Sequence, residues 1–124
     1  MSTDDQKIVV LVYDILSFCE AAKSYTHDLS FETFEQDPLV QDAVCYRLLS
    51  IGEACNRIHD IDSRFLRDSV SSSIDWRNII NMRHILAHGY DRLDLSTVWA
   101  VLDQHLDPLI EATRGFLKRC GPLQ

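Results

Sequence analysis

Four residues that can bind phosphate or transfer protons lie close together in the sequence: Arg83, His84, His88 and Tyr90. An arginine guanidinium presents a planar fork of donors that suits phosphate oxygens, and histidine changes its charge near neutral pH. A tyrosine hydroxyl can donate or accept a hydrogen bond. Together these groups suit cleavage of RNA by attack of a 2′-hydroxyl on the adjacent phosphorus. That reaction needs proton transfer and charge stabilisation but no metal.

Each group has a distinct role in this hypothesis. His88 would move the proton, Arg83 would hold the non-bridging oxygens as negative charge builds, and Tyr90 would position the phosphate. His84 is a supporting candidate. At about 100° per residue, however, Arg83 and His88 lie roughly 140° apart around a regular helix. Either His88 lies in an unwound final turn, or two copies of the chain bring both motifs together. We favour the second arrangement and expect a homodimer with a composite site.

Two alternatives account for the same residues. Arg and His in the last turn of a helix are stabilised by the helix dipole, by about 0.3 to 1 kcal/mol at an exposed site, and Tyr90 alone would be a packing residue. His84 and His88 are one turn apart, as in a HExxH zinc motif, but Ile85 stands where that motif has glutamate. Nothing fixes a third ligand, so we expect neither a metal nor a cofactor.

The expected second helix has a polar edge made of Arg47, Glu53, Asn56 and Arg57. A solvated face with ion pairs along the helix explains this edge. The alternative is that Arg47 or Arg57 faces the same cleft as Arg83. Gly52 lies beside the edge, and glycine inside a helix costs about 1 kcal/mol relative to alanine. We therefore expect close packing at Gly52, with the third helix as the candidate neighbour.

The spacing of apolar residues predicts four main helices. They cover residues 4–26, 38–59, 76–88 and the segment that Asp94 opens. Asp37 and Asp75 are expected to cap the second and third helices, and Thr3 with Gln6 resembles a capping box for the first. Pro108 should kink the last helix because it removes one backbone hydrogen bond. Ser30 can cap a short turn, and residues 60–74 should form a connector with one helical turn. These elements predict an all-α, up-and-down four-helix bundle.

Composition limits the remaining possibilities. At 124 residues, with 46% hydrophobic and 25% charged residues, the chain fits one globular domain over residues 1–124. Its net charge of −7 disfavours nucleic-acid binding over the whole surface, because phosphates attract Lys and Arg. Any contact with RNA must therefore be local.

Cysteine usage and hydropathy indicate the compartment. The four cysteines, at positions 19, 45, 55 and 120, lack the spacing of a zinc motif and the density of a disulfide scaffold. Cys45 and Cys55 are expected to be buried thiols. The apolar stretch 8–12 is interrupted at Asp14, well short of the roughly 20 residues of a membrane span. No basic signal-peptide region precedes it. We expect a cytoplasmic protein without membrane contact.

Several segments, in this order, resemble the HepT-like branch of the HEPN superfamily. They are Phe31-x-x-Phe34-x-x-Asp37-Pro38, Ile51-Gly52-Glu53-Ala54-Cys55-Asn56-Arg57, Asp75-Trp76-Arg77-Asn78-Ile79-Ile80, Met82-Arg83-His84-Ile85-Leu86-Ala87-His88-Gly89-Tyr90 and Asp94-Leu95-x-x-Val98-Trp99. The central element is Arg-x4-His-x-Tyr, filled by Arg83, His88 and Tyr90. Where the family often has Asn or Asp after the motif arginine, this chain has His84.

The resemblance implies a homodimeric helical bundle and a metal-independent ribonuclease with its site at the dimer cleft. It also implies a toxin of a prokaryotic toxin–antitoxin pair. The antitoxin of that family is a minimal nucleotidyltransferase that transfers AMP to the motif tyrosine, here Tyr90. The competing hypothesis is a non-catalytic module whose Arg83 to Tyr90 edge binds a nucleotidyltransferase partner or a nucleotide.

Overall fold

The computed structural model describes residues 2–88 and 94–121, with His88 described in its backbone only. Within these ranges the regular elements are all helical and no strand occurs. They are α1 (Thr3–Thr26), α2 (Phe31–Glu35), α3 (Pro38–Ile61), the π-helical turn η1 (Leu66–Val70), α4 (Trp76–His88), α5 (Leu95–Gln104) and α6 (Leu106–Cys120). The predicted all-α fold is confirmed.

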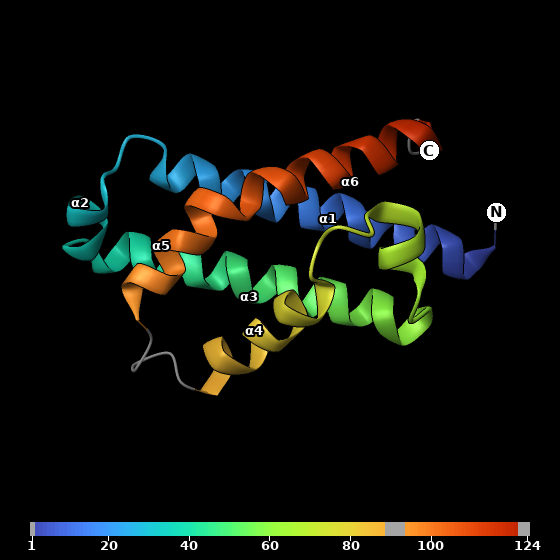
Figure 1. Ribbon diagram of the computed structural model, residues 1–124, viewed down its shortest axis with the longest axis horizontal. Helices are drawn as coiled ribbons and strands as arrows, with labels where there is room; N and C mark the ends of the chain where they lie inside the picture. The colour runs from blue at the N-terminus through green and yellow to red at the C-terminus, as the bar shows by residue number, and fades with distance from the viewer. Residues whose placement is uncertain (1, 89–93, 122–124) are drawn as a thin grey trace.

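The long helices alternate in direction along the chain (Figure 1). α1 packs on α3 and on α6, and α3 also packs on α4. The short helix α5 contacts α2 and leads into α6. The predicted up-and-down arrangement is therefore confirmed, with α5 and α6 together forming its fourth member. In none of the described helices is there a segment long and apolar enough to cross a membrane.

The helices begin at the predicted capping residues, with one exception. The carboxylates of Asp37, Asp75 and Asp94 each accept a backbone N–H of the following turn, at 3.2, 3.2 and 2.9 Å. For α1 the prediction was one residue off, because the cap is Ser2 and Thr3 is already helical. α3 continues two residues beyond the predicted end, to Ile61. The predicted range 76–88 for α4 is confirmed.

The last helix breaks where the sequence predicted only a kink. Pro108 has no N–H to donate to the carbonyl four residues earlier, that of Gln104, where α5 ends. At His105 the backbone departs from regular α-helical angles, with φ −112° and ψ −23°, while it stays in the right-handed region, and α6 begins at Leu106. Two helices therefore replace the single kinked helix. The break lets α5 pack near α2 while α6 continues along α1.

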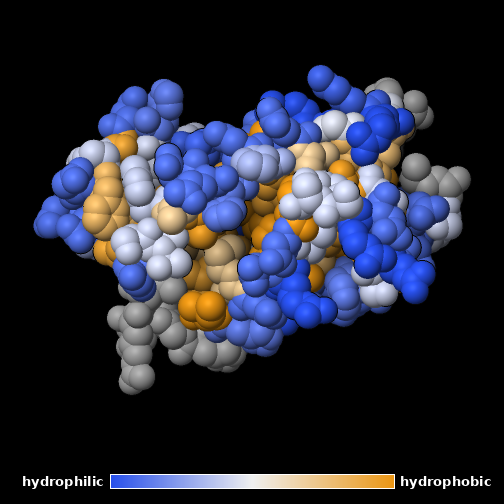
Figure 2. Space-filling model, in the orientation of Figure 1, coloured by the Kyte–Doolittle hydropathy of each residue, from blue (hydrophilic) through white to orange (hydrophobic). Residues whose placement is uncertain are grey.

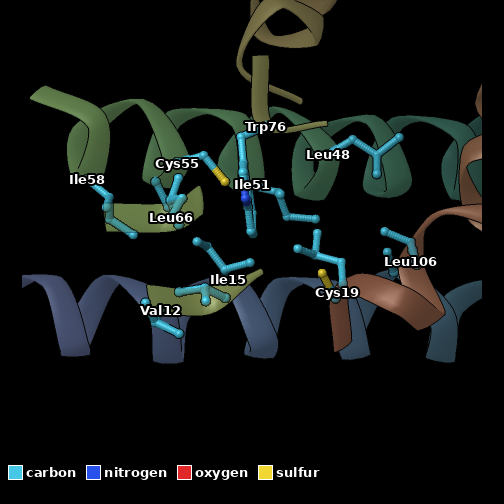
Figure 3. Close-up of a cluster of buried hydrophobic side chains, with 14 of the residues drawn as sticks. Val12, Ile15, Cys19, Leu48, Ile51, Cys55, Ile58, Leu66, Trp76 and Leu106 are labelled. Atoms are coloured by element: carbon cyan, nitrogen blue, oxygen red, sulfur yellow. The ribbon is translucent and has the colours of Figure 1, made fainter. Parts of the chain in front are cut away.

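The buried core lies mainly between α1 and α3 (Figure 3). Val12, Ile15 and Cys19 of α1 face Leu48, Ile51, Cys55 and Ile58 of α3, and Leu66, Trp76 and Leu106 close the cluster. The buried Trp76 keeps its one polar atom paired, because the indole N–H donates to the Ser71 carbonyl at 2.8 Å. This tryptophan anchors the first turn of α4 in the core.

Three of the four cysteines belong to this core, as expected for Cys45 and Cys55. Burial raises the pKa of Cys19 to about 12 and that of Cys45 to about 11, and it raises the pKa of Cys55 as well. A thiol with a raised pKa stays neutral and is a poor nucleophile at neutral pH. Cys120 is exposed at the end of α6. The buried thiols therefore act as packing groups.

The two leucines Leu48 and Leu39 provide a matched test of the core. Leu48→Ala, at a side chain only 1% exposed, should lower the free energy of unfolding by about 2 to 5 kcal/mol because it leaves a cavity between α1 and α3. Leu39→Ala, on the same helix but 79% exposed, should change it by less than about 0.5 kcal/mol. Chemical denaturation of both variants measures the difference. Equal effects would contradict this location of the core.

Candidate active site

The buried residues of α4 determine which way Arg83 faces. Trp76 and Leu86 are buried, and Ile79 and Met82 pack partly against the core, so one side of the helix lies on α3. Arg83 lies four residues after Ile79, which places both on the same side of the helix. Its side chain therefore starts at the contact between α4 and α3.

The two helices are in close contact at Gly52. A Cβ atom at this position would lie 3.0 Å from the carbonyl oxygen of Ile79 and 3.1 Å from the Cβ of Arg83. Such distances leave no room for a methyl group without movement of the α4 backbone. The prediction that the third helix packs closely on Gly52 is confirmed, and the contact falls at Arg83 itself.

The guanidinium of Arg83 is held on both sides. Nη1 donates to Oε1 of Glu53 at 3.2 Å, and Nη2 lies 3.3 Å from Nε2 of His84. The Arg83 and Glu53 side chains are 24% and 47% exposed, so the ion pair orients the guanidinium more than it stabilises the fold. Nε of Arg83 is buried and has no hydrogen-bond partner in the described part of the chain. Because this nitrogen is buried, the terminal Nη1 and Nη2 groups make the contacts of the guanidinium.

Glu53 is the partner that the sequence prediction did not identify. It was included only as part of the polar edge of the second helix. Its position next to Gly52 could have identified it, because a residue beside a close contact between two helices is within reach of the neighbouring helix. The structure thus brings Glu53, Arg83 and His84 together.

Arg47, the other supporting candidate, lies on a different side of α3. Its Nε donates to the hydroxyl of Tyr25 at 3.2 Å, and its guanidinium carbon lies 5.6 to 5.9 Å from the ring centroids of Phe18, Tyr25 and Tyr46. Arg47 and Gly52 are roughly 140° apart around α3. Within one chain Arg47 therefore turns toward α1, whereas Arg83 lies on the α4 side.

The structure describes only some of the remaining predicted site residues. The side chain of His88 and the whole of Tyr90 lie outside the described residues, and so does the proposed AMP acceptor hydroxyl. Arg57 is exposed on α3. In the ranges 2–88 and 94–121, no group of three His, Cys, Asp or Glu side chains is placed to hold a metal ion.

Comparisons with known proteins agree with this architecture. The family described as "Ribonuclease HepT-like" matches residues 15–115, most of the chain. Two similar proteins come from Methanocaldococcus jannaschii: "Putative RNase MJ1380", 28% identical over 84% of this chain and 89% of its own length, and "Putative RNase MJ0125", 32% identical over 74% and 75%. "Probable ribonuclease HepT" of Thermococcus cleftensis is 30% identical over 77% and 83%. No solved structure matches the chain.

The helical bundle and the family match define an all-α protein of the HEPN type. The chain belongs to the HepT-like ribonuclease family, and this membership classes it as a ribonuclease. The resemblance inferred from the sequence motifs is confirmed.

Two helical glycines allow a matched test of the contact at Gly52. Gly115→Ala in α6 should raise the free energy of unfolding by about 0.5 to 1 kcal/mol, because a Cβ there meets only Nη1 of Arg119 at 3.6 Å. Gly52→Ala should instead lower it, by about 1 to 3 kcal/mol, because the methyl group pushes against the α4 backbone. Thermal or chemical denaturation measures both. A stabilising Gly52→Ala would show that the close contact does not fix α4.

Proposed function

We propose that the protein is a metal-independent endoribonuclease that acts as a homodimer and serves as the toxin of a toxin–antitoxin pair. The fixed position of Arg83, the motif arginine, supports this proposal most directly. Its backbone is fixed against Gly52 and its guanidinium is oriented by Glu53 and His84. A fixed, partly buried guanidinium is the kind of group that stabilises charge developing on a phosphate.

The proposed reaction is an internal transfer at phosphorus. The 2′-oxygen forms a bond to the adjacent phosphorus, the bond to the 5′-oxygen of the next nucleotide breaks, and the products are a 2′,3′-cyclic phosphate and a 5′-hydroxyl. His88 moves the proton from the 2′-hydroxyl toward the leaving oxygen. Arg83 binds the non-bridging oxygens, and Tyr90 orients the phosphate. All bonds and protons in this step are accounted for without a metal ion.

Two observations support a dimer with a shared cleft. Arg83 and His88 are five positions apart on α4, and on a regular helix this spacing puts the two positions roughly 140° apart. A second copy can supply the missing group. Figure 2 also shows hydrophobic side chains gathered in the middle of one face, in the region between α4 and α6. A second copy that covers this face would remove the apolar surface from water.

The proposed partner is a minimal nucleotidyltransferase antitoxin that transfers AMP to Tyr90 in the cytoplasm. The phenol oxygen would attack the α-phosphorus of ATP, and pyrophosphate would leave. An adenylylated Tyr90 would carry an added phosphate, which would compete with RNA for Arg83. This part of the proposal rests on the family match and on the motif around Arg83.

A cleavage assay tests the catalytic proposal. Purified protein with EDTA present should cleave total RNA or tRNA, and His88→Ala should lower the rate by at least about 100-fold because proton transfer is lost. His27→Ala, at a histidine that pairs with Asp28 at the end of α1, is the matched control and should cleave like the wild type. Circular dichroism confirms that the helices survive in both variants. Equal cleavage by wild type and His88→Ala would rule out the role of His88.

Growth of a bacterial host tests the biological role. Expression of the wild-type chain alone should slow growth, and His88→Ala should restore it at the same protein level. If both chains are tolerated and the wild type copurifies with a nucleotidyltransferase, the protein is the non-catalytic interaction module instead. The net charge of −7 favours that second candidate, because an acidic surface repels RNA.

A further inference from the structure

A groove of about 520 Å³ lies between the C-terminal half of α3 and the first turns of α4, and it is also lined by η1 and the connector around it. We call it the flanking groove. Its apolar lining comes from Leu66, Ile74, Trp76 and Ile80, and its polar lining includes Asn56, His59, Arg67, Arg77 and Asn81. This volume falls within the range of small-molecule sites, roughly 300 to 1,000 Å³, so it can hold one nucleotide.

The flanking groove begins next to the Arg83 contact. On α3, Asn56 lies one turn after Gly52, and on α4, Ile80 directly follows Ile79, whose carbonyl approaches Gly52. The groove therefore opens beside the close contact at Gly52, toward the N-terminal end of α4.

A row of polar residues on α4 connects the groove with the candidate active site. Arg77, Asn81 and His84 are four and three residues apart, so they share one face of the helix. His84 contacts the guanidinium of Arg83. Arg77 and His84 are separated by roughly 10 Å along the axis, a length that a short stretch of single-stranded RNA covers.

Some hydrogen-bonding groups of the flanking groove already have a partner in the chain, and others have none among the described residues. The acidic groups are engaged locally: Asp62 accepts the backbone N–H of Arg64 at 3.1 Å, and Asp75 accepts that of Asn78 at 3.2 Å. Arg67 is also engaged, through its ion pair with Asp68 at 3.0 Å.

By contrast, the guanidinium of Arg77 and the amide of Asn56 have no partner among the described residues. Arg77 is exposed and therefore accessible to a ligand. The groove thus offers an unpaired arginine and, in Asn56, an unpaired amide beside an apolar surface. A phosphate, a ribose or base edge, and a base plane are the matching groups of RNA.

We infer that the flanking groove is an RNA subsite that binds the nucleotide next to the scissile phosphate. Arg77 binds a phosphate, Asn56 hydrogen-bonds the base or ribose, and the base lies on the apolar lining. This inference rests on the proposed ribonuclease function, in which Arg83 holds the scissile phosphate one to two turns along α4. It also explains how an acidic chain contacts RNA through a small number of positions.

Binding of an uncleavable RNA tests the subsite without catalysis. The probe is a short, fluorescein-labelled single strand that is 2′-O-methylated throughout, measured by fluorescence anisotropy over a range of salt concentrations. Arg77→Ala should weaken binding roughly three- to tenfold and should lower the slope of log Kd against log salt by about 0.7, because one phosphate contact is lost. Asn56→Ala should weaken binding by a similar factor without changing the slope, because no phosphate is involved.

Arg114→Ala is the matched control, since it also removes one arginine, on α6, where the guanidinium pairs with Glu20 of α1. It should bind the probe like the wild type. Arg77→Lys should keep the wild-type salt slope, because the charge remains. An Arg77→Ala variant that binds no more weakly than Arg114→Ala, or absence of probe binding by the wild type, would overturn the subsite.

The same variants separate failure of the subsite from failure of the proposed function. If the wild type binds the probe, Arg77→Ala weakens that binding, and no RNA is cleaved, the subsite stands and the catalytic proposal fails. If RNA is cleaved while Arg77→Ala changes neither probe binding nor KM, the catalytic proposal stands and the subsite fails.

Discussion

The absence of a side chain at Gly52 sets the distance between α3 and α4. Helix packing depends on the volume of the residues at the contact, and a Cβ at Gly52 would already meet the Ile79 carbonyl at 3.0 Å. Because Arg83 lies at the same contact, its Cβ is held against α3 and its guanidinium reaches Glu53. The position of the motif arginine is therefore a consequence of backbone packing. The flanking groove beside it depends on the same contact.

Charge is distributed so that several cations are already paired. Lys23 lies near Asp107, Arg67 near Asp68 and Arg114 near Glu20, all within 4 Å. Such pairs on an exposed surface contribute little to stability, but they reduce the cationic surface that RNA can contact. With a net charge of −7, binding of RNA depends on a small number of correctly placed groups and should be sensitive to salt. The chain is suited to local recognition of a short segment.

α4 combines two surfaces with different roles. Its inner side is attached to the core by Trp76 and Leu86, while its outer side carries Arg77, Asn81, His84 and the 57% exposed Ile85. Because α4 packs mainly on α3, this outer side is not covered by another helix of the bundle. The helix is thus attached to the bundle on one side and exposed on the other. An exposed isoleucine beside the motif is consistent with such a contact.

The sequence alone predicted the helices, most of their caps and the importance of Gly52, because these depend on local spacing and on the special geometry of glycine, proline and capping side chains. It also identified the family through the order of its motifs. It did not show that Pro108 breaks the last helix rather than bending it, because the outcome depends on what α5 and α6 pack against. It did not identify Glu53 as the partner of Arg83, the aromatic surroundings of Arg47 or the flanking groove. These features join residues from different helices, and only the packing of those helices determines which side chains meet.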